Sequence, residues 1–150
     1  MRGMNSQAVN SISLRIQHVA NMLMRESDQI LQEQLGIGMS QFRILKTVQA
    51  NHRLLQRQIA SMLHQTEASI SRQVALMLQQ KLIVTQRNPK DRREHITTLT
   101  PKGRRIVEAA EQVLQSFHAS FLSDLPEKQQ ADLLNTLTTI EQRVIARKLP

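Results

Sequence analysis

The sequence predicts a mainly α-helical chain in which one short β hairpin interrupts the helices. Apolar residues recur with a period of about 3.6 residues, as in an amphipathic helix, over most of the chain. β-Branched residues gather in two short segments, 82–87 and 95–100, with turn-forming residues between them. The 150 residues include no cysteine, so neither disulfides nor thiolate metal sites can hold the fold together. A single domain over residues 1–150 is long enough to bury its own hydrophobic core.

Four helices are predicted before the hairpin. Their expected ranges are residues 10–34, 40–51, 56–63 and 67–80. Gly36 and Gly38 end the first, long helix, and Ser40 is the expected N-cap of the second. Thr66 is the expected N-cap of the fourth helix, after a tight turn that begins at His64. Two short helices joined by a tight turn predict a helix-turn-helix.

Positive charge concentrates on the predicted hairpin. The whole chain holds 20 Lys and Arg against 12 Asp and Glu, a net charge of +8. Residues 81–105 hold eight basic and two acidic side chains, a net +6, whereas residues 106–150 hold four basic and six acidic side chains, a net −2. Such a cluster is either a solvated surface or a contact for a polyanion. Its place at a hairpin turn favours the polyanion contact.

Two further helices are predicted after the hairpin, one that begins after Gly103, at residue 104, and one beyond a break at residues 124–126. Helices, a helix-turn-helix, a basic hairpin and more helices are the plan of a winged helix-turn-helix with a two-stranded β wing. The outer helices, 10–35 and 104–148, have apolar stripes that a winged-helix lobe of residues 40–103 is too small to cover. We expect a second copy of the chain to cover them, which makes them dimerisation helices of a homodimer.

The run from Asp91 to Gly103, DRREHITTLTPKG, resembles the wing motif of the MarR family of bacterial transcription regulators. The resemblance continues in register through residues 78–83 and through residues 69–72, and it extends over nearly the whole chain. Residues 81–103 carry most of its specificity. It implies a winged-helix homodimer that binds a pseudo-palindromic operator in double-stranded DNA. It also implies a ligand-responsive repressor that a small-molecule effector releases from the DNA.

The helix-turn-helix supplies the first group of candidate DNA-binding residues. The start of its second helix enters the major groove, where base edges present a readable pattern of donors and acceptors. The residues expected at the DNA are Gln65, Thr66, Ser69, Ser71 and Arg72. Arg72 has the planar guanidinium that binds guanine or phosphate through two hydrogen bonds. For Thr66, a helix cap is an equally good interpretation.

The predicted wing supplies the second group, because Arg92 and Arg93 lie at its turn. A narrow minor groove concentrates negative potential, so an arginine inserted there gains electrostatically. The resemblance implies that Arg93 is this minor-groove arginine. Asp91 is expected to brace an arginine or the turn backbone, although aspartate is also common in turns for local reasons.

Two positions depart from the family pattern. Lys81 stands where the family commonly has glycine, which costs about 1 kcal/mol if the backbone is left-handed there. Leu76 stands where relatives often have a basic residue, which leaves Arg72 as the only basic side chain from residue 65 to residue 80. The wing is therefore expected to supply most of the electrostatic attraction to DNA.

The resemblance also implies an effector pocket between the dimerisation helices and the winged-helix lobe. It maps onto one histidine and four apolar residues: His18, Met22, Phe42, Leu45 and Phe117. The same five residues are equally consistent with plain core packing. With no Trp or Tyr and three Phe, the chain offers few aromatic surfaces for stacking on an effector.

Other functional classes find little support. The five histidines lack the close helical spacing of a zinc motif, so we expect no metal ligands, and no cofactor motif is present. No phosphate-binding glycine loop or nucleophile motif suggests an enzyme. No apolar run approaches the roughly 18 residues of a membrane span, so a cytoplasmic protein without membrane contact is expected. Three alternatives remain: a non-specific nucleoid or RNA-binding protein, a metal-responsive regulator, and a helical interaction module with incidental charge.

Overall fold

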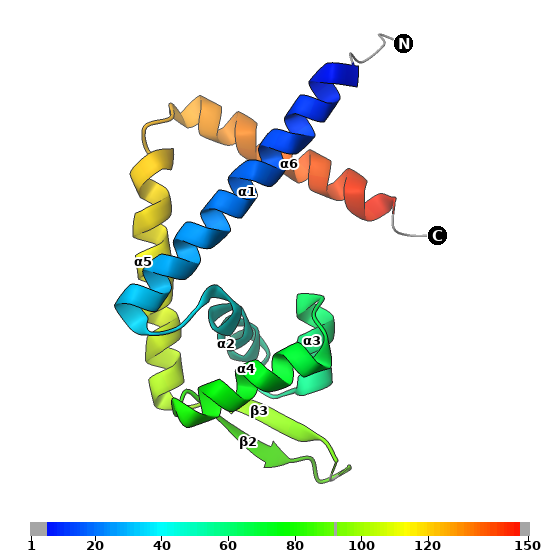
Figure 1. Cartoon of the computed structure of the whole chain (residues 1–150), viewed down its shortest axis with the longest axis vertical. Helices are drawn as coiled ribbons and strands as arrows, with labels where there is room; N and C mark the ends of the chain where they lie inside the picture. Colours follow the sequence, from blue (N-terminus) through cyan, green and yellow to red (C-terminus); the bar gives the residue numbers. More distant parts are fainter. Residues whose placement is uncertain (1–5, 92, 148–150) are drawn as a thin grey trace. The chain divides into compact units, whose positions relative to one another are not determined.

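The computed structural model describes residues 6–91 and 93–147 and is mainly helical (Figure 1). In chain order the elements are α1 (Ser6–Leu35), α2 (Met39–Asn51), β1 (Leu54–Leu55), α3 (Gln56–Leu63), α4 (Glu67–Gln79), β2 (Ile83–Arg87), β3 (His95–Leu99), α5 (Pro101–Leu122) and α6 (Glu127–Ala146). The predicted order of helices, helix-turn-helix, hairpin and helices is confirmed. Within the described ranges no helix combines the length and the apolar character that crossing a bilayer needs.

The chain forms two compact units that share helix α5. The first unit ends at Leu114 and contains the helix-turn-helix and the sheet, and the second begins at Gln115 and contains the end of α5 and all of α6. All sixteen buried apolar residues found in the described part of the chain belong to the first unit. The expectation of a single domain with dimerisation helices at residues 10–35 and 104–148 stays a prediction.

The hydrophobic core of the first unit is built from one face of each helix and from the start of the hairpin. Residues that are almost completely buried come from α1, α2, α3, α4, β2 and α5: Leu31, Ile44, Leu45, Ile59, Ile70, Met77, Ile83 and Val107. Because α3 and α4 both contribute to this one core, the turn between them is held by packing on either side. The helix-turn-helix is therefore held as one element by the core that it shares with α2 and α5.

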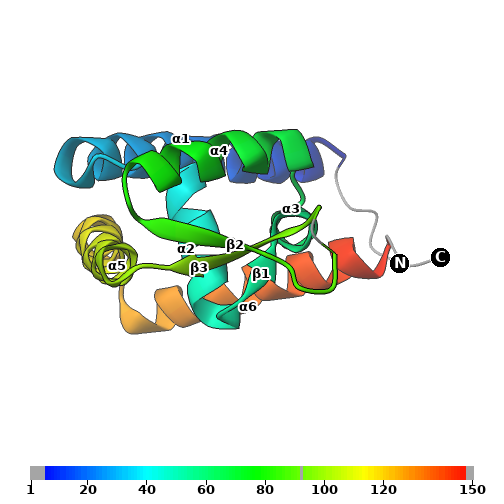
Figure 2. The ribbon, with the colours of Figure 1, turned by 90° about the horizontal axis from the view of Figure 1, so that it is seen from below.

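The sheet has three strands rather than the two predicted. Its order is β1-β3-β2 with antiparallel pairs, and Figure 2 shows the three strands side by side. The hairpin runs from the pair Ile83–Leu99 to the pair Arg87–His95. The added strand, β1, pairs Leu54 with Thr97 and Leu55 with Ile96. A strand of two residues is too short for apolar alternation to reveal it, because its partner is supplied only by the tertiary fold.

The N-cap prediction for α4 is confirmed, whereas that for α2 is wrong. Thr66 caps α4, since its hydroxyl accepts a hydrogen bond of 3.2 Å from Ser69 N. Helix α2 has Gly38 as its N-cap, and Ser40 lies inside the helix. The backbone N–H of Met39, which has no partner within α2, donates to Oδ1 of Asp28 at 2.7 Å. Asp28 belongs to helix α1. A carboxylate brought from another helix satisfies the helix end, so no local cap is needed.

Helix α5 begins at Pro101, three residues before the predicted boundary at residue 104. Gly103 N donates to Thr100 Oγ1 at 2.9 Å, which makes Thr100 the residue that caps this helix. Pro101 then takes the first helical position, where its missing N–H costs nothing. The Thr-Pro pair is thus a helix start, and β3 ends one residue earlier, at Leu99.

Helix α4 ends in a left-handed turn at Lys81, as the departure from the family pattern suggested. Lys81 has a φ of 58°. Leu82 N donates to Met77 O at 2.9 Å and Lys81 N donates to Leu78 O at 3.0 Å, the two bonds of a Schellman motif. A lysine therefore holds a backbone conformation that glycine adopts without steric cost.

Replacing Lys81 by glycine is expected to raise the free energy of unfolding by about 1 kcal/mol, because the left-handed conformation then costs nothing. Urea denaturation followed by circular dichroism measures the change. Gln79→Gly is the matched control: this residue has a helical conformation, so its replacement is expected to destabilise by about 0.5–1 kcal/mol. If Lys81→Gly and Gln79→Gly lowered the free energy of unfolding equally, the left-handed backbone at Lys81 would not be strained.

Candidate nucleic-acid interface

The helix-turn-helix is closed by a tight, left-handed turn at His64. His64 has a φ of 52°, and Gln65 N donates to Ala60 O at 2.9 Å across the turn. Helix α3 buries Ile59 and Ala60, and helix α4 buries Ile70, Val74 and Met77. The opposite face of α4 is consequently left for solvent or a ligand.

The five candidate residues of the helix-turn-helix lie at the start of α4 and in the turn before it. Thr66, Ser71 and Arg72 are exposed, and Gln65 and Ser69 are half-buried. The Thr66 hydroxyl is engaged as the cap of α4. Among the described residues, the Arg72 guanidinium has no hydrogen-bond or ion-pair partner. Arg72 is thus the free cation on this face, one turn before Leu76, which is 48% exposed.

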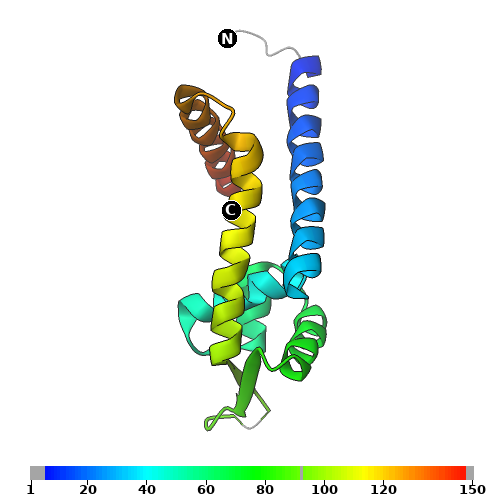
Figure 3. The same ribbon diagram turned by 90° about the vertical axis from the view of Figure 1, so that its left-hand side faces the viewer.

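The wing extends beyond α3 and α4 as a hairpin (Figure 3). Hydrogen bonds within its turn fix the backbone: Asn88 N donates to Glu94 O at 2.9 Å, and Glu94 N donates to Asp91 O at 3.0 Å. The Asp91 carboxylate accepts from Arg93 N at 2.9 Å, so it holds the turn backbone at the candidate minor-groove arginine. Arg92, the neighbouring candidate, lies outside the described residues.

Free positive charge dominates the wing. Arg87, Lys90 and Arg93 are exposed. The two acidic residues of the described turn, Asp91 and Glu94, are both engaged in hydrogen bonds. In the part of the wing that the structure describes, the Arg93 guanidinium has no ion-pair partner. An approaching polyanion therefore meets cations whose charge no carboxylate of the described wing neutralises.

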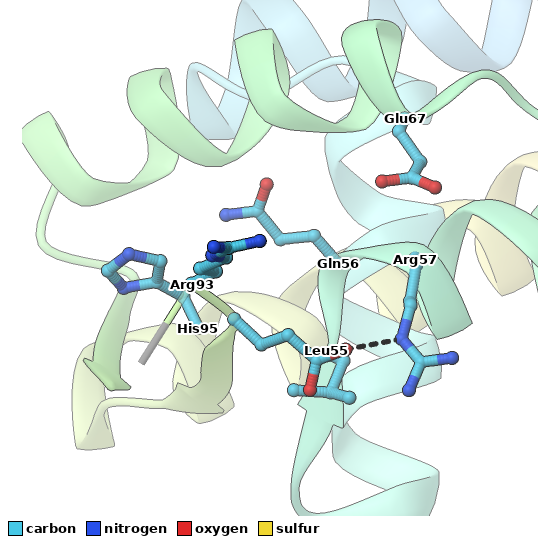
Figure 4. Close-up of a pocket in the computed structure, with 7 residues that line it drawn as sticks. Leu55, Gln56, Arg57, Glu67, Arg93 and His95 are labelled. Atoms are coloured by element: carbon cyan, nitrogen blue, oxygen red, sulfur yellow. Dashed lines mark hydrogen bonds and ion pairs between the residues drawn. The ribbon is translucent and has the colours of Figure 1, made fainter. Parts of the chain in front are cut away.

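A small hollow of about 140 Å³ lies where the wing meets the helix-turn-helix. Its walls come from β1, α3, α4, the wing turn and β3: Leu55, Gln56, Arg57, Glu67, Arg93, Glu94 and His95. Figure 4 shows the Arg93 and Gln56 side chains next to each other across it. The hollow brings the start of α3, the start of α4 and the base of the wing turn together at one place.

One ion pair crosses from the helix-turn-helix to the wing. Arg57 Nε, on α3, donates to Glu94 Oε1 at 2.6 Å, the contact drawn as a dashed line in Figure 4. Glu94 Oε2 also accepts from Asn88 Nδ2 at 2.8 Å. Sequence reasoning counted both charges without assigning them a role. The two residues are 37 positions apart, and no local pattern could have connected them.

The five residues of the expected effector pocket have dissimilar surroundings. Leu45 is completely buried in the core and Phe42 packs against it, whereas His18 and Met22 are exposed on α1. Phe117 belongs to the second unit, where its ring centre lies 5.3 Å from that of Phe121. The pocket stays a prediction. Among the described residues, no three His, Cys, Asp or Glu side chains gather where they could hold a metal ion.

Comparison with known proteins gives matches in the region of the helix-turn-helix and the wing. The model of the MarR family matches residues 35–94, which include the helix-turn-helix and most of the hairpin. The HTH-type transcriptional regulator BilQ of Clostridium symbiosum is 33% identical over 82 residues, which are 55% of this chain and 57% of that protein. The match thus spans little more than half the length of this curated relative.

Solved structures share the fold over nearly the whole chain. A MarR family protein from Bacillus stearothermophilus has a TM-score of 0.81 at 19% identity, covering 95% of this chain and 99% of that one. MepR of S. aureus, in a complex with DNA, has a TM-score of 0.75 at 24% identity, covering 89% and 97%. At these identities the likeness is one of fold. The chain is thus similar to the MarR family over residues 35–94 and shares the fold of a MarR family protein over nearly its whole length.

Proposed function

We propose that the protein is a sequence-specific DNA-binding transcription regulator that acts as a homodimer on a pseudo-palindromic operator. The observation that carries this proposal is the combination, in one compact unit, of an exposed Arg72 on α4 with a wing whose Arg93 is free. MepR, which shares the fold, has been solved in a complex with DNA. The match to the MarR family at residues 35–94 and the shared fold of the transcriptional regulator BldR from Sulfolobus Solfataricus also support a regulator.

Each part of the interface has its own role in this proposal. The start of α4 enters the major groove, where Arg72 binds guanine or phosphate and Ser69, Ser71 and Gln65 contact base edges or the backbone. Arg93 inserts into the adjacent minor groove and responds to its width and potential. Asp91 holds the turn backbone in place through Arg93 N. Thr66 contributes mainly as the cap of α4.

A homodimer is supported by the apolar side chains that the outer helices leave exposed. On α1 these are Ile12, Leu14, Val19, Met22 and Met24, and on α6 they are Leu133, Leu134, Leu137, Val144 and Ile145. Within the described part of α6 no residue is buried. Helices with such stripes are stable when a partner covers them. Two copies would present two wings and two α4 helices to half-sites about one helical turn apart.

Repression, and release from DNA by a small molecule, form the regulatory part of the proposal. Both rest on the resemblance to the MarR family. The best-supported alternative is a protein that binds DNA or RNA without sequence preference. The same free basic wing favours it, because phosphate attraction alone supplies non-specific affinity.

The proposed function is tested by letting the purified chain select duplexes from a random-sequence pool. Selected duplexes should bind at least roughly a thousandfold more tightly than bulk DNA. The logarithm of the affinity should fall linearly with the logarithm of the salt concentration. Sedimentation should give two chains per duplex. Equal affinity for selected and bulk DNA would establish the non-specific alternative, and salt-independent or absent binding would refute a nucleic-acid function.

A further inference from the structure

The wing is attached to the helix-turn-helix at two levels. At the first level, β1 pairs with the middle and outer part of β3 through Leu54–Thr97 and Leu55–Ile96. Farther toward the tip, one residue before β3 begins at His95, Glu94 binds Arg57 of α3. Among the described residues, this ion pair is the outermost polar contact between the wing and the helices. Beyond it, the side chain of Asp91 and the backbone N–H of Lys90 form hydrogen bonds within the turn.

Glu94 is the point where three segments of this region are tied together. One carboxylate oxygen accepts from Arg57 and the other from Asn88, the residue that follows β2. The backbone of Glu94 also bonds to Asn88 and to Asp91 on the far side of the turn. Since Arg93 directly precedes Glu94, any shift of Glu94 moves the candidate minor-groove arginine. The bond to Arg57 therefore fixes the position of the wing tip relative to the start of α3.

We propose that the Arg57–Glu94 ion pair sets the direction of the wing relative to α4, so that Arg57 and Glu94 are positioning residues for DNA site selection. The inference rests on the proposed function and deepens it. The Arg57 side chain is 61% exposed and that of Glu94 is 23% exposed. A pair this open to solvent contributes little to stability. Its consequence is geometric. It fixes the distance between Arg72, which contacts the major groove, and Arg93, which contacts the minor groove, and both must reach the same half-site.

The test uses two single variants whose charge changes are opposite. Glu94→Ala removes a negative charge and Arg57→Ala removes a positive one, so bulk electrostatics alone would raise DNA affinity in the first and lower it in the second. Loss of positioning instead lowers the preference for selected over bulk duplexes in both variants. We expect that preference to fall about tenfold in each, the lower end of what the loss of one arginine contact costs.

A charge swap and two matched controls complete the experiment. The double variant with Arg57→Glu and Glu94→Arg keeps the net charge and can restore the pair, so it should recover most of the preference. Arg15→Ala and Glu108→Ala remove the same charges from exposed positions on α1 and α5, and they should leave the preference unchanged. Thermal melting of all variants should stay close to that of the wild type, because the Arg57 side chain is 61% exposed and solvent screens its charge.

The outcomes separate this inference from the function on which it rests. If the wild type prefers its selected duplexes but both single variants keep the same preference, the positioning role is overturned and the proposed function stands. Both single variants could lose the preference for selected duplexes while the charge-swapped double variant fails to restore it. That result would show that the ion pair does not cause the preference. If the wild type shows no preference at all, the proposed function fails and the inference fails with it.

Discussion

Replacing Gly103 by alanine is expected to lower the free energy of unfolding by at least about 3 kcal/mol, a large fraction of the total stability of a domain. A Cβ at this position would overlap the carbonyl oxygen of Leu82 and lie 3.0 Å from its carbonyl carbon. That carbonyl cannot retreat easily, because it accepts from Thr100 N at 3.0 Å and from Thr100 Oγ1 at 3.1 Å. Thr100 in turn caps α5, so the clash disturbs the sheet and the helix together.

Urea denaturation followed by circular dichroism measures this loss. Gly36→Ala is the matched control, because Gly36 has a positive φ of 66° and open space where its Cβ would lie. Its expected cost is only about 1 kcal/mol, that of a left-handed backbone at alanine. If both variants lost the same amount, close packing against Leu82 would not be the reason for a glycine at residue 103.

Replacing Arg93 by alanine is expected to weaken binding to selected duplexes roughly ten- to hundredfold, the usual cost of losing one specific arginine contact. The free guanidinium at the wing turn is the group that the proposed minor-groove contact requires. The slope of log affinity against log salt should also become shallower, by about one for each wing and so by about two for the dimer. Stability should not change, since the side chain is exposed.

Fluorescence anisotropy over a salt series measures affinity and slope together. Arg15→Ala, which removes the same charge from an exposed position on α1, is the matched control and should change both quantities far less. An unchanged affinity and slope in Arg93→Ala would exclude this role for the wing while leaving Arg72 and α4 open as the DNA contact.

The main features of the helices were predictable because each depends on neighbouring residues. The apolar period set the order of the helices, and the Thr66 cap depends on a hydroxyl and an amide three residues apart. The left-handed turn at Lys81 could be suspected from the position of glycine in relatives. The motif of residues 91–103 indicated a resemblance to the MarR family, and the family model matches residues 35–94, which lead into that motif.

Features that depend on distant residues were missed. The N-cap of α2 was assigned to Ser40, because the carboxylate that binds Met39 N comes from Asp28 on another helix. Strand β1 was not predicted, since two residues form a strand only when β3 lies beside them. Among the candidate site residues, the sequence indicated Arg72, Arg93 and Asp91 but could not connect Arg57 with Glu94.

The sequence by itself determined the helical order, the basic hairpin and the resemblance to the MarR family, because periodicity, turn residues and a contiguous motif are properties of neighbouring positions. Only the tertiary structure decided which distant groups meet: a carboxylate of α1 at the start of α2, a third strand against the wing, and an arginine of α3 on a glutamate of the wing. Such pairs are selected by packing of the whole unit, and packing acts between positions that the order of residues leaves far apart.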